Sequence, residues 1–469
     1  MADKTRIMKT RITLTVLVIT MLSSLSGFAQ AQDPECMTNL SIFHEYVKAD
    51  NFDAAYTPWM SVRTKCPKFN RAIIVDGEKI LKHKIEKTSG DEQLKYLNDL
   101  LKLYDEAHEN YASKYSLGEV LQDKAQLFYK YRDELGKSDE DLYNEYDKIY
   151  VKDKKEFTSA SALYTYFKLM VSLYDAGKKP TQDLFNKYDD VIEKIEEEIQ
   201  NASEKLNKYV AKEEAGEKLS SKEMKYKKYY EQTLEAYDKV TGSINTELGG
   251  RADCETLIPL YNKDFESKKS DAVWLKRAVN RMYNKECTED PLYIQLVKAY
   301  DQTAPSSDTK VFVAGLLLKD GKTNEALGYF RQASDLETDN YKKGKLAEKI
   351  GQILKKKGRY GEARGYYREA LKLNPSNGRP HLAIAIMYGN SANNCGSTTF
   401  EKRAVYWYAA QEAEKAGRVD PTLKGAASQT AASYRAKAPS KSDIFNSDMA
   451  GKTITIGCWI NGSVTVPKL

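Results

Sequence analysis

Histidine is scarce in this chain, which contains only four in 469 residues. His44, His83, His108 and His381 are not spaced as zinc ligands on one helix face, and His44 has no second histidine to complete a metalloprotease helix. The sequence also lacks a G-x-S-x-G nucleophile elbow. We therefore expect no metal site and no catalytic residues, although paired carboxylates among the 67 acidic residues stay open.

A phosphate-binding loop is missing as well. Two G-K-T triplets begin at Gly321 and Gly451, but a phosphate loop needs another glycine five positions earlier, where this chain has Leu316 and Asn446. That glycine lets the backbone amides surround the phosphates. We expect no nucleotide and no other cofactor.

Long apolar runs are confined to the N-terminus. Basic residues at positions 4, 6, 9 and 11 precede the apolar run 12–22, and Ala29-Gln30-Ala31 follows. This order is typical of an export signal, so residues 1–31 are predicted to be a signal peptide that is cleaved after Ala31. An uncleaved anchor is the alternative, although the run is shorter than the roughly 20 residues that a span needs.

The charge has no strong excess of one sign. The net charge is +6, and removal of residues 1–31, with four basic residues and one acidic residue, lowers it to +3. Nucleic-acid binding proteins usually have a basic surface, so we expect no nucleic-acid partner. The basic run 222–228 (KEMKYKK) is interpreted as a solvated helix face.

Six cysteines in an exported chain favour disulfide bonds, which persist outside the cytoplasm. Six cysteines allow fifteen pairings, and the sequence does not choose among them rigorously. Their positions fall into neighbouring pairs, and buried free thiols are the alternative. We predict the bonds Cys36 to Cys66, Cys254 to Cys287, and Cys395 to Cys458.

Residues 344–377 have the pattern of two short antiparallel helices. Gly358 provides the turn, and Asn374-Pro375 ends the second helix because proline restricts the residue before it. The positions that pack are Ala347, Ile350, Gly351 and Leu354 on the first helix, and Tyr360, Ala363, Tyr367 and Ala370 on the second. This unit resembles the tetratricopeptide repeat, in which small residues allow two helices to approach closely and aromatic residues fill the space between them.

The unit recurs on both sides. Residues 307–340 repeat it, and Ala409, Ala413, Ala416 and Pro421 reproduce the spacing downstream after an insertion near 390–400. We predict that residues 307–440 form repeats closed by a capping helix at about 422–437, since a terminal repeat must cover its open face. Residues 251–306 are predicted to be a helical hairpin that continues the solenoid.

Residues 32–250 are predicted to be tetratricopeptide-like and to contain long helices. Leucine and tyrosine recur at three- and four-residue spacing from about Asp91 to Glu247. We expect one long helix at 181–211 with Thr181 as its cap, a mobile turn at 212–228, and a domain boundary at 242–253.

The last segment, residues 441–469, changes character. Asn461-Gly462 lies between two β-prone runs, which predicts a hairpin with its turn at that dipeptide. Because a lone hairpin is marginally stable, we expect it to dock on its own chain; pairing with a strand of a partner is the alternative. The predicted fold class is all-α, an antiparallel helix-pair solenoid (a tetratricopeptide-like superhelix) with a small C-terminal β-hairpin.

In tetratricopeptide proteins the first helix of each repeat lines the concave face, so the resemblance implies a peptide groove. The candidate groove residues are Lys345, Glu348, Gln352, Lys355, Lys356 and Arg379. The carboxylate clamp of chaperone-binding members needs an asparagine late in the first helix, but this chain has Gln352 and Ile386 there. A clamp for a C-terminal carboxylate is therefore not inferred, and ordinary solvated residues are the alternative for the whole set.

Our preferred hypothesis is a non-enzymatic scaffold or adaptor that binds an envelope protein or a peptide segment. The chain resembles exported tetratricopeptide proteins of Gram-negative bacteria, above all Bacteroidota, which implies the periplasm or the outer membrane and at most a peripheral membrane contact. The alternative is an envelope protein that binds a glycan or another small molecule in a tyrosine-rich cleft within 91–247, because the chain has 33 tyrosines. A permanent, mechanical part of an assembly is a third possibility. The sequence names neither the partner nor the oligomeric state.

Overall fold

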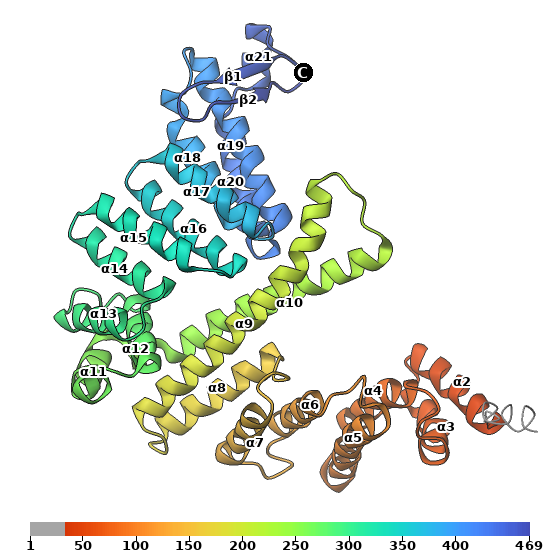
Figure 1. Cartoon of the computed structure of the whole chain (residues 1–469). Coiled ribbons are helices and arrows are strands. Elements are labelled where there is room, and N and C mark those ends of the chain that lie inside the picture. The colour runs from red at the N-terminus through yellow and green to blue at the C-terminus, as the bar shows by residue number, and fades with distance from the viewer. Residues whose placement is uncertain (1–32) are drawn as a thin grey trace, which may run out of the picture. The chain divides into compact units, whose positions relative to one another are not determined.

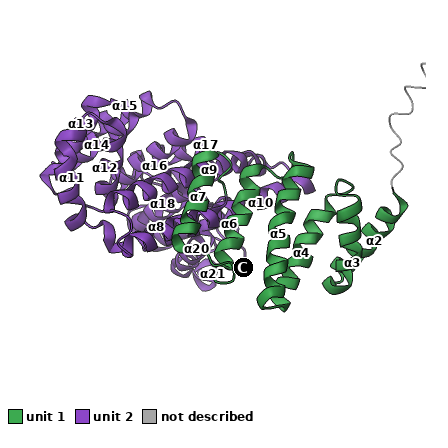
Figure 2. Cartoon of the chain, turned by 90° about the horizontal axis from the view of Figure 1, so that it is seen from below, with its two compact units in different colours: residues 1–158 green, residues 159–469 purple. Residues whose placement is uncertain are grey.

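The computed structural model describes residues 33–469, and the predicted signal peptide lies outside the described residues. The chain divides into two compact units, residues 1–158 and residues 159–469 (Figure 2). Each unit has a hydrophobic core of its own. Among the described helices, none combines the length and the apolar composition that crossing a membrane would require.

The first unit is built from α-helices that pack on their neighbours in sequence. Trp59 is fully buried, and its indole Nε1 donates a hydrogen bond of 2.7 Å to the carbonyl oxygen of Ile73. The helices are α2 (Pro34–Lys48), α3 (Phe52–Lys65), α4 (Ala72–Lys87), α5 (Gly90–Tyr111), α6 (Leu117–Lys130) and α7 (Asp139–Lys152).

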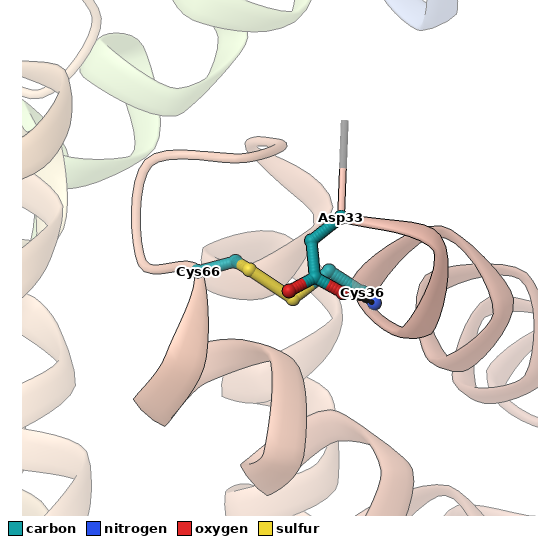
Figure 3. A group of neighbouring side chains, drawn as sticks. All are labelled: Asp33, Cys36 and Cys66. Atoms are coloured by element: carbon teal, nitrogen blue, oxygen red, sulfur yellow. Dashed lines mark hydrogen bonds between the residues drawn. A yellow bond between two sulfur atoms is a disulfide. The ribbon is translucent and has the colours of Figure 1, made fainter. Parts of the chain in front are cut away.

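A disulfide between Cys36 and Cys66 joins the start of α2 to the end of α3, as predicted. Asp33 lies beside it, as Figure 3 shows. Its carboxylate accepts hydrogen bonds from the backbone amides at the start of α2 and pairs with Lys65 at 2.9 Å. Since both sulfurs are bonded to each other, this group is a helix cap beside a disulfide and supplies no thiolate for a metal.

The second unit contains the remaining elements (Figure 1). Its helices are α8 (Ala160–Asp175), α9 (Thr181–Glu214), α10 (Ser221–Leu248), η1 (Gly249–Ala252), α11 (Cys254–Lys268), α12 (Ala272–Asn284), α13 (Pro291–Thr303), α14 (Ser307–Lys319), α15 (Thr323–Leu336), α16 (Asn340–Lys356), α17 (Tyr360–Leu373), α18 (Arg379–Ser391), η2 (Ala392–Asn394), α19 (Thr399–Val419), η3 (Pro421–Leu423), α20 (Lys424–Lys437) and α21 (Lys441–Ser447). Its strands are β1 (Thr453–Ile456) and β2 (Gly462–Thr465).

The predicted repeats are antiparallel helix pairs. Helix α14 packs on α15, α16 on α17, and α18 on α19, while α20 covers α19 as the expected cap. Gly321 and Gly358 make the turns inside the first two pairs with φ of +76° and +74°, a region that glycine adopts without strain. The predicted insertion separates α18 from α19 and contains η2.

Helices α9 and α10 form a long antiparallel pair in the second unit, and three expectations about them need correction. Thr181 is the first residue of α9 and not its cap, because Pro180 precedes the helix and no side chain caps it. The helix continues to Glu214 and α10 begins at Ser221, so the connection is shorter than 212–228. The boundary expected at 242–253 differs from the observed division, because α10 continues through Gly242 and the compact units separate between Thr158 and Ser159.

The other two predicted disulfides are also present in the second unit. Cys254 at the start of α11 is bonded to Cys287, which follows α12. Cys395, which follows η2, is bonded to Cys458 in the hairpin loop. The second bond ties the insertion to the C-terminal hairpin, as expected.

The C-terminal hairpin docks on its own unit. Ile454 and Val464 face each other across β1 and β2, and both belong to the core formed with the repeats. The expected turn at Asn461-Gly462 was wrong, because residues 457–461 form the loop and Gly462 already belongs to β2. Asn461 has a φ of +43°, so the tolerance of asparagine for positive φ is satisfied at the last residue of a longer loop.

Candidate binding groove

The candidate groove is a cavity between the long α9–α10 pair and the repeats. It has a volume of about 310 Å³, which is at the small end of the range for ligand pockets. One wall comes from α9 and α10 and is half apolar and half polar, with Ile192, Ile195, Ile199 and Leu234 beside Glu196, Ser203, Asp238 and Thr241. The opposite wall is polar and comes from the repeats, with Tyr341, Lys345, Glu348, Asn377, Arg379 and Asp420.

Helix α9 reaches this position because one of its faces contacts successive junctions between the repeats. Gln200 donates a hydrogen bond of 2.8 Å to Asp339, just before α16. Asn207, two turns further on, accepts one of 2.8 Å from the backbone amide of Ser376, between α17 and α18. Leu206 and Val210 pack on Val419 at the end of α19. A helix of the same chain therefore packs against three junctions of the repeats beside the cavity.

Glu348 is held in place by hydrogen bonds from both sides. The side chain is buried, and its carboxylate accepts bonds from Gln352 at 3.1 Å and from Asn377 at 2.7 Å. These amides partly replace the water that the carboxylate loses on burial. Glu348 therefore has a fixed position in the wall of the cavity.

Asp420 is the second buried acid of the wall. Its carboxylate accepts hydrogen bonds from the hydroxyl of Thr422 at 2.6 Å and from the backbone amide of Gly378 at 3.1 Å. Burial raises the pKa of Asp420 in spite of these bonds. The carboxylate holds the start of α18 against the end of α19, and thereby positions Arg379.

The two cations of the wall are more accessible. Lys345 and Arg379 are both exposed, and neither forms an ion pair with a residue in the described range 33–469. The ammonium group of Lys345 lies 5.6 Å from the ring centre of Tyr341, which is a weak interaction. Both cations are therefore available to an acidic group of a ligand.

Only some of the six predicted groove residues line this cavity. Lys345, Glu348 and Arg379 line the cavity, and Gln352 supports Glu348. Lys355 does not line it and is half-buried, and burial lowers its pKa. Lys356 lines a different cavity, of about 260 Å³, between α14 and α16.

Sequence reasoning missed the contribution of α9 and α10 to the groove. Ile192 and Ile199, which lie more than 100 residues before the repeats in sequence, line it, and so does Asp238. The hydrophobic period of α9 indicates that one face is buried, but periodicity does not identify what covers it. Lys349 was also missed; its ammonium group lies 4.5 Å from the ring centre of Tyr283, and burial lowers its pKa.

The geometry of the repeats agrees with a comparison of sequences. Residues 345–377 match the profile of the tetratricopeptide repeat. This chain contains a tetratricopeptide repeat. A second profile, that of the Est1 DNA/RNA binding domain, matches residues 363–410. No curated protein matches this chain at a significant level.

Solved structures with a similar arrangement of helices share little sequence with this chain. A tetratricopeptide repeat protein from Parabacteroides merdae is 12% identical, with 69% of this chain and 98% of that chain covered and a TM-score of 0.25. Human IFIT1, solved as a dimer with m7Gppp-AAAA, is 14% identical, with coverages of 76% and 74% and a TM-score of 0.33. Yeast Tom70 is 12% identical, with coverages of 87% and 82% and a TM-score of 0.26.

The fold class is therefore the predicted one, antiparallel helix pairs of the tetratricopeptide type with a small C-terminal β-hairpin. Tetratricopeptide repeats generally mediate protein–protein interaction and are generally not catalytic. This level of function follows from the repeat itself.

Proposed function

We propose that this protein is a non-enzymatic scaffold or adaptor of a bacterial cell envelope, and that its tetratricopeptide groove binds a short segment of another protein that carries an acidic side chain. The observation that carries this proposal is the convergence of Lys345 and Arg379 on one cavity beside the fixed wall of Glu348. A preformed surface loses little conformational entropy when it binds, which favours a segment that is itself flexible.

The chemistry of the cavity sets the kind of segment. Ile192, Ile195 and Ile199 offer an apolar surface next to Glu196 and Asp238. The opposite wall combines two exposed cations, Lys345 and Arg379, with two buried acids, Glu348 and Asp420. A segment that carries an aliphatic residue, one acidic side chain for the cations and a hydrogen-bond donor for the acids would match both walls. Because α9 already packs against the repeats beside the cavity, we expect a few residues of the partner to enter and not a long helix.

The three disulfides support the envelope location. Cys36 to Cys66, Cys254 to Cys287 and Cys395 to Cys458 use all six cysteines of the chain. Such bonds persist in oxidising compartments and are rare in the bacterial cytoplasm. The near balance of charge, with 73 basic and 67 acidic residues, favours a protein partner over nucleic acid.

The glycan alternative in residues 91–247 has weaker support. Many tyrosines of that segment are packed in the interior of their own unit, among them Tyr104, Tyr143, Tyr146, Tyr166 and Tyr237. A buried ring does not stack on a ligand. The number of tyrosines in this segment is therefore better explained by helix packing.

The proposal is tested by reversing the charge of the groove. A photo-reactive residue at position 241, which lines the cavity and leaves both cations in place, should crosslink the full chain in its source cells to a defined protein partner that mass spectrometry identifies. Binding of the identified partner should fall by about 30-fold or more in the Lys345→Glu/Arg379→Glu variant, if each cation contributes about 1 kcal/mol.

The control makes the same change of charge elsewhere. Lys298 and Arg331 are exposed, lie outside the cavity and form no ion pair within the described part of the chain. The Lys298→Glu/Arg331→Glu variant should bind as the wild type does. Equal loss in both variants would show that net charge and not the groove attracts the partner, and the groove assignment would then be abandoned.

A further inference from the structure

A second cavity lies in the same unit, away from the repeat groove, where the first half of α9 meets α11 and α12. Its volume is about 410 Å³, within the range of small-molecule sites. The lining residues that matter below are Gln182, Asp189, Tyr261, Asp264, Trp274 and Arg281. The groove proposed for a protein partner uses none of them.

The cavity has an aromatic wall that is fixed in position. Trp274 is half-buried and meets the buried ring of Tyr261 edge to face, with 5.6 Å between ring centres. The disulfide between Cys254 and Cys287 closes the α11–α12 pair that carries both rings. The indole of Trp274 is therefore a rigid apolar surface in an otherwise polar cavity.

The charges of the lining neutralise one another, apart from that of Asp264. Arg281 forms an ion pair with Asp189, and burial raises the pKa of Asp189 to about 6 in spite of this arginine. Arg277 donates a hydrogen bond of 2.8 Å to Asp190, and Lys268 lies 3.9 Å from Asp271. A site without a strong excess of charge favours a neutral ligand over an ionic one.

Two side-chain atoms and one carboxylate of the lining lack a protein partner. In the described residues, Oε1 of Gln182 and Nε of Arg281 are buried atoms without a hydrogen bond. The carboxylate of Asp264, which is half-buried, has no partner within residues 33–469 either. A buried polar atom without a partner costs about 1–3 kcal/mol, so a ligand that pairs with these atoms would bind favourably.

The unpaired atoms specify the chemistry of that ligand. Gln182 Oε1 and Asp264 need donors, whereas Arg281 Nε needs an acceptor. A hydroxyl group is both a donor and an acceptor. An organic cation would suit Trp274 and the acids, but it would leave the arginine donor unpaired.

We propose that this cavity binds a neutral polyhydroxylated ligand of saccharide size, which stacks on Trp274 and exchanges hydrogen bonds with Gln182, Asp264 and Arg281. The site is independent of the repeat groove. A protein with both sites could hold a protein partner and a saccharide at the same time.

The test uses the purified full chain and saturation-transfer NMR. The probes are glucose, galactose, mannose, N-acetylglucosamine and disaccharides of each. We expect saturation transfer to at least one of them, and about tenfold weaker binding in Trp274→Ala and in Gln182→Ala, equivalent to about 1.4 kcal/mol each. Trp274→Phe should recover part of the affinity, because it keeps an aromatic surface.

The matched control is Tyr229→Ala, which removes an aromatic ring that is 60% exposed on α10 and lies outside the cavity. Circular dichroism and thermal unfolding show whether each variant is folded, and Asp264→Asn replaces Trp274→Ala if the latter is not. The proposal is overturned if no saccharide binds at concentrations up to about 10 mM. It is also overturned if binding is unchanged in Gln182→Ala and Asp264→Asn, or if only arginine or choline binds.

Discussion

Gly351 and Tyr367 illustrate how the repeat spacing acts at single residues. The ring of Tyr367 is fully buried between α16 and α17, and a Cβ added at Gly351 would lie 2.9 Å from it. Glycine at this position is therefore a packing requirement and not a turn. The repeat pattern predicted that both residues lie on the packing faces of the two helices, and the structure brings these two positions into contact.

A substitution of this glycine should destabilise the second unit. Gly351→Ala is expected to lower the free energy of unfolding by about 1–3 kcal/mol, since the ring has no free space to move into. Gly365→Ala in α17 is the control, because nothing lies within 4 Å of its added Cβ. That variant should be neutral or up to about 1 kcal/mol more stable. Urea unfolding of both variants tests the difference, and equal effects would contradict the packing argument.

The buried acid Glu412 gives stability a dependence on pH. Burial raises the pKa of its carboxyl, but the hydrogen bonds from His381 at 2.5 Å and from Lys415 at 3.0 Å outweigh burial, so the pKa lies below its usual 4.5. Because the folded pKa is depressed, the stabilisation is complete above pH 4.5 and is lost as the pH falls through the folded value.

Glu412→Gln should therefore lower the free energy of unfolding by about 1–3 kcal/mol near pH 7. The difference in free energy of unfolding between the wild type and the variant should become smaller as the pH falls below 4.5. Denaturant unfolding at several pH values measures this difference. Glu369→Gln changes an exposed acid on α17 and should leave stability almost unchanged throughout. A difference in stability that grows as the pH falls would contradict the lowered pKa of Glu412.

At the scale of elements, the C-terminal hairpin is held in two ways. Ile454, Ile456, Val464 and Val466 are buried in the core of the repeats, and the disulfide from Cys395 to Cys458 fixes the loop. Burial of several large aliphatic side chains is worth about 1.5–3 kcal/mol each. The apolar face should therefore contribute more to docking than the disulfide does.

Hydrogen exchange can measure how much the apolar face and the disulfide each contribute to docking of the hairpin. Cys395→Ala/Cys458→Ala should lower global stability by about 2–4 kcal/mol while β1 and β2 stay protected. Ile454→Asp should abolish that protection, because the aspartate would be buried without a partner. Thr455→Asp on the exposed face of β1 is the matched control and should keep it. Loss of protection in the cysteine variant alone would show that the disulfide holds the hairpin.

Some of these elements were predictable and others were not. The helix pairs from 307 to 421 follow from small and aromatic residues at fixed offsets, a local property. The hairpin was predicted, but its turn was misplaced, because Asn461 favours positive φ equally well at the end of a five-residue loop. The position of α9 against Asp339 and Ser376 depends on contacts over 139 and 169 residues, for which the sequence pattern has no signal.

At the scale of the whole molecule, the chain has two units with separate cores. Trp59 is at the centre of one, and Tyr367 belongs to the other. Separate cores favour separate cooperative transitions. We therefore expect thermal unfolding to show two steps.

Each step should respond to a substitution in its own unit. A Cβ at Gly77 would lie 2.5 Å from the ring of Trp59, so Gly77→Ala should shift the unfolding of residues 33–158 only. Gly351→Ala should shift that of residues 159–469 only. Hydrogen exchange of peptides from each unit distinguishes the two, and a common shift by either variant would show a single cooperative molecule.

The contacts of α9 with three repeat junctions have a mechanical consequence. A tetratricopeptide array without such a helix is elastic, because each repeat contacts only its neighbours and every junction can bend slightly. Helix α9 is joined to successive junctions through Gln200, Asn207 and Val210. A stiff helix attached in this way braces the array along its length. Stretching the array would first have to break these contacts, so we expect a helix that is not itself a repeat to oppose changes in the curvature of the repeats.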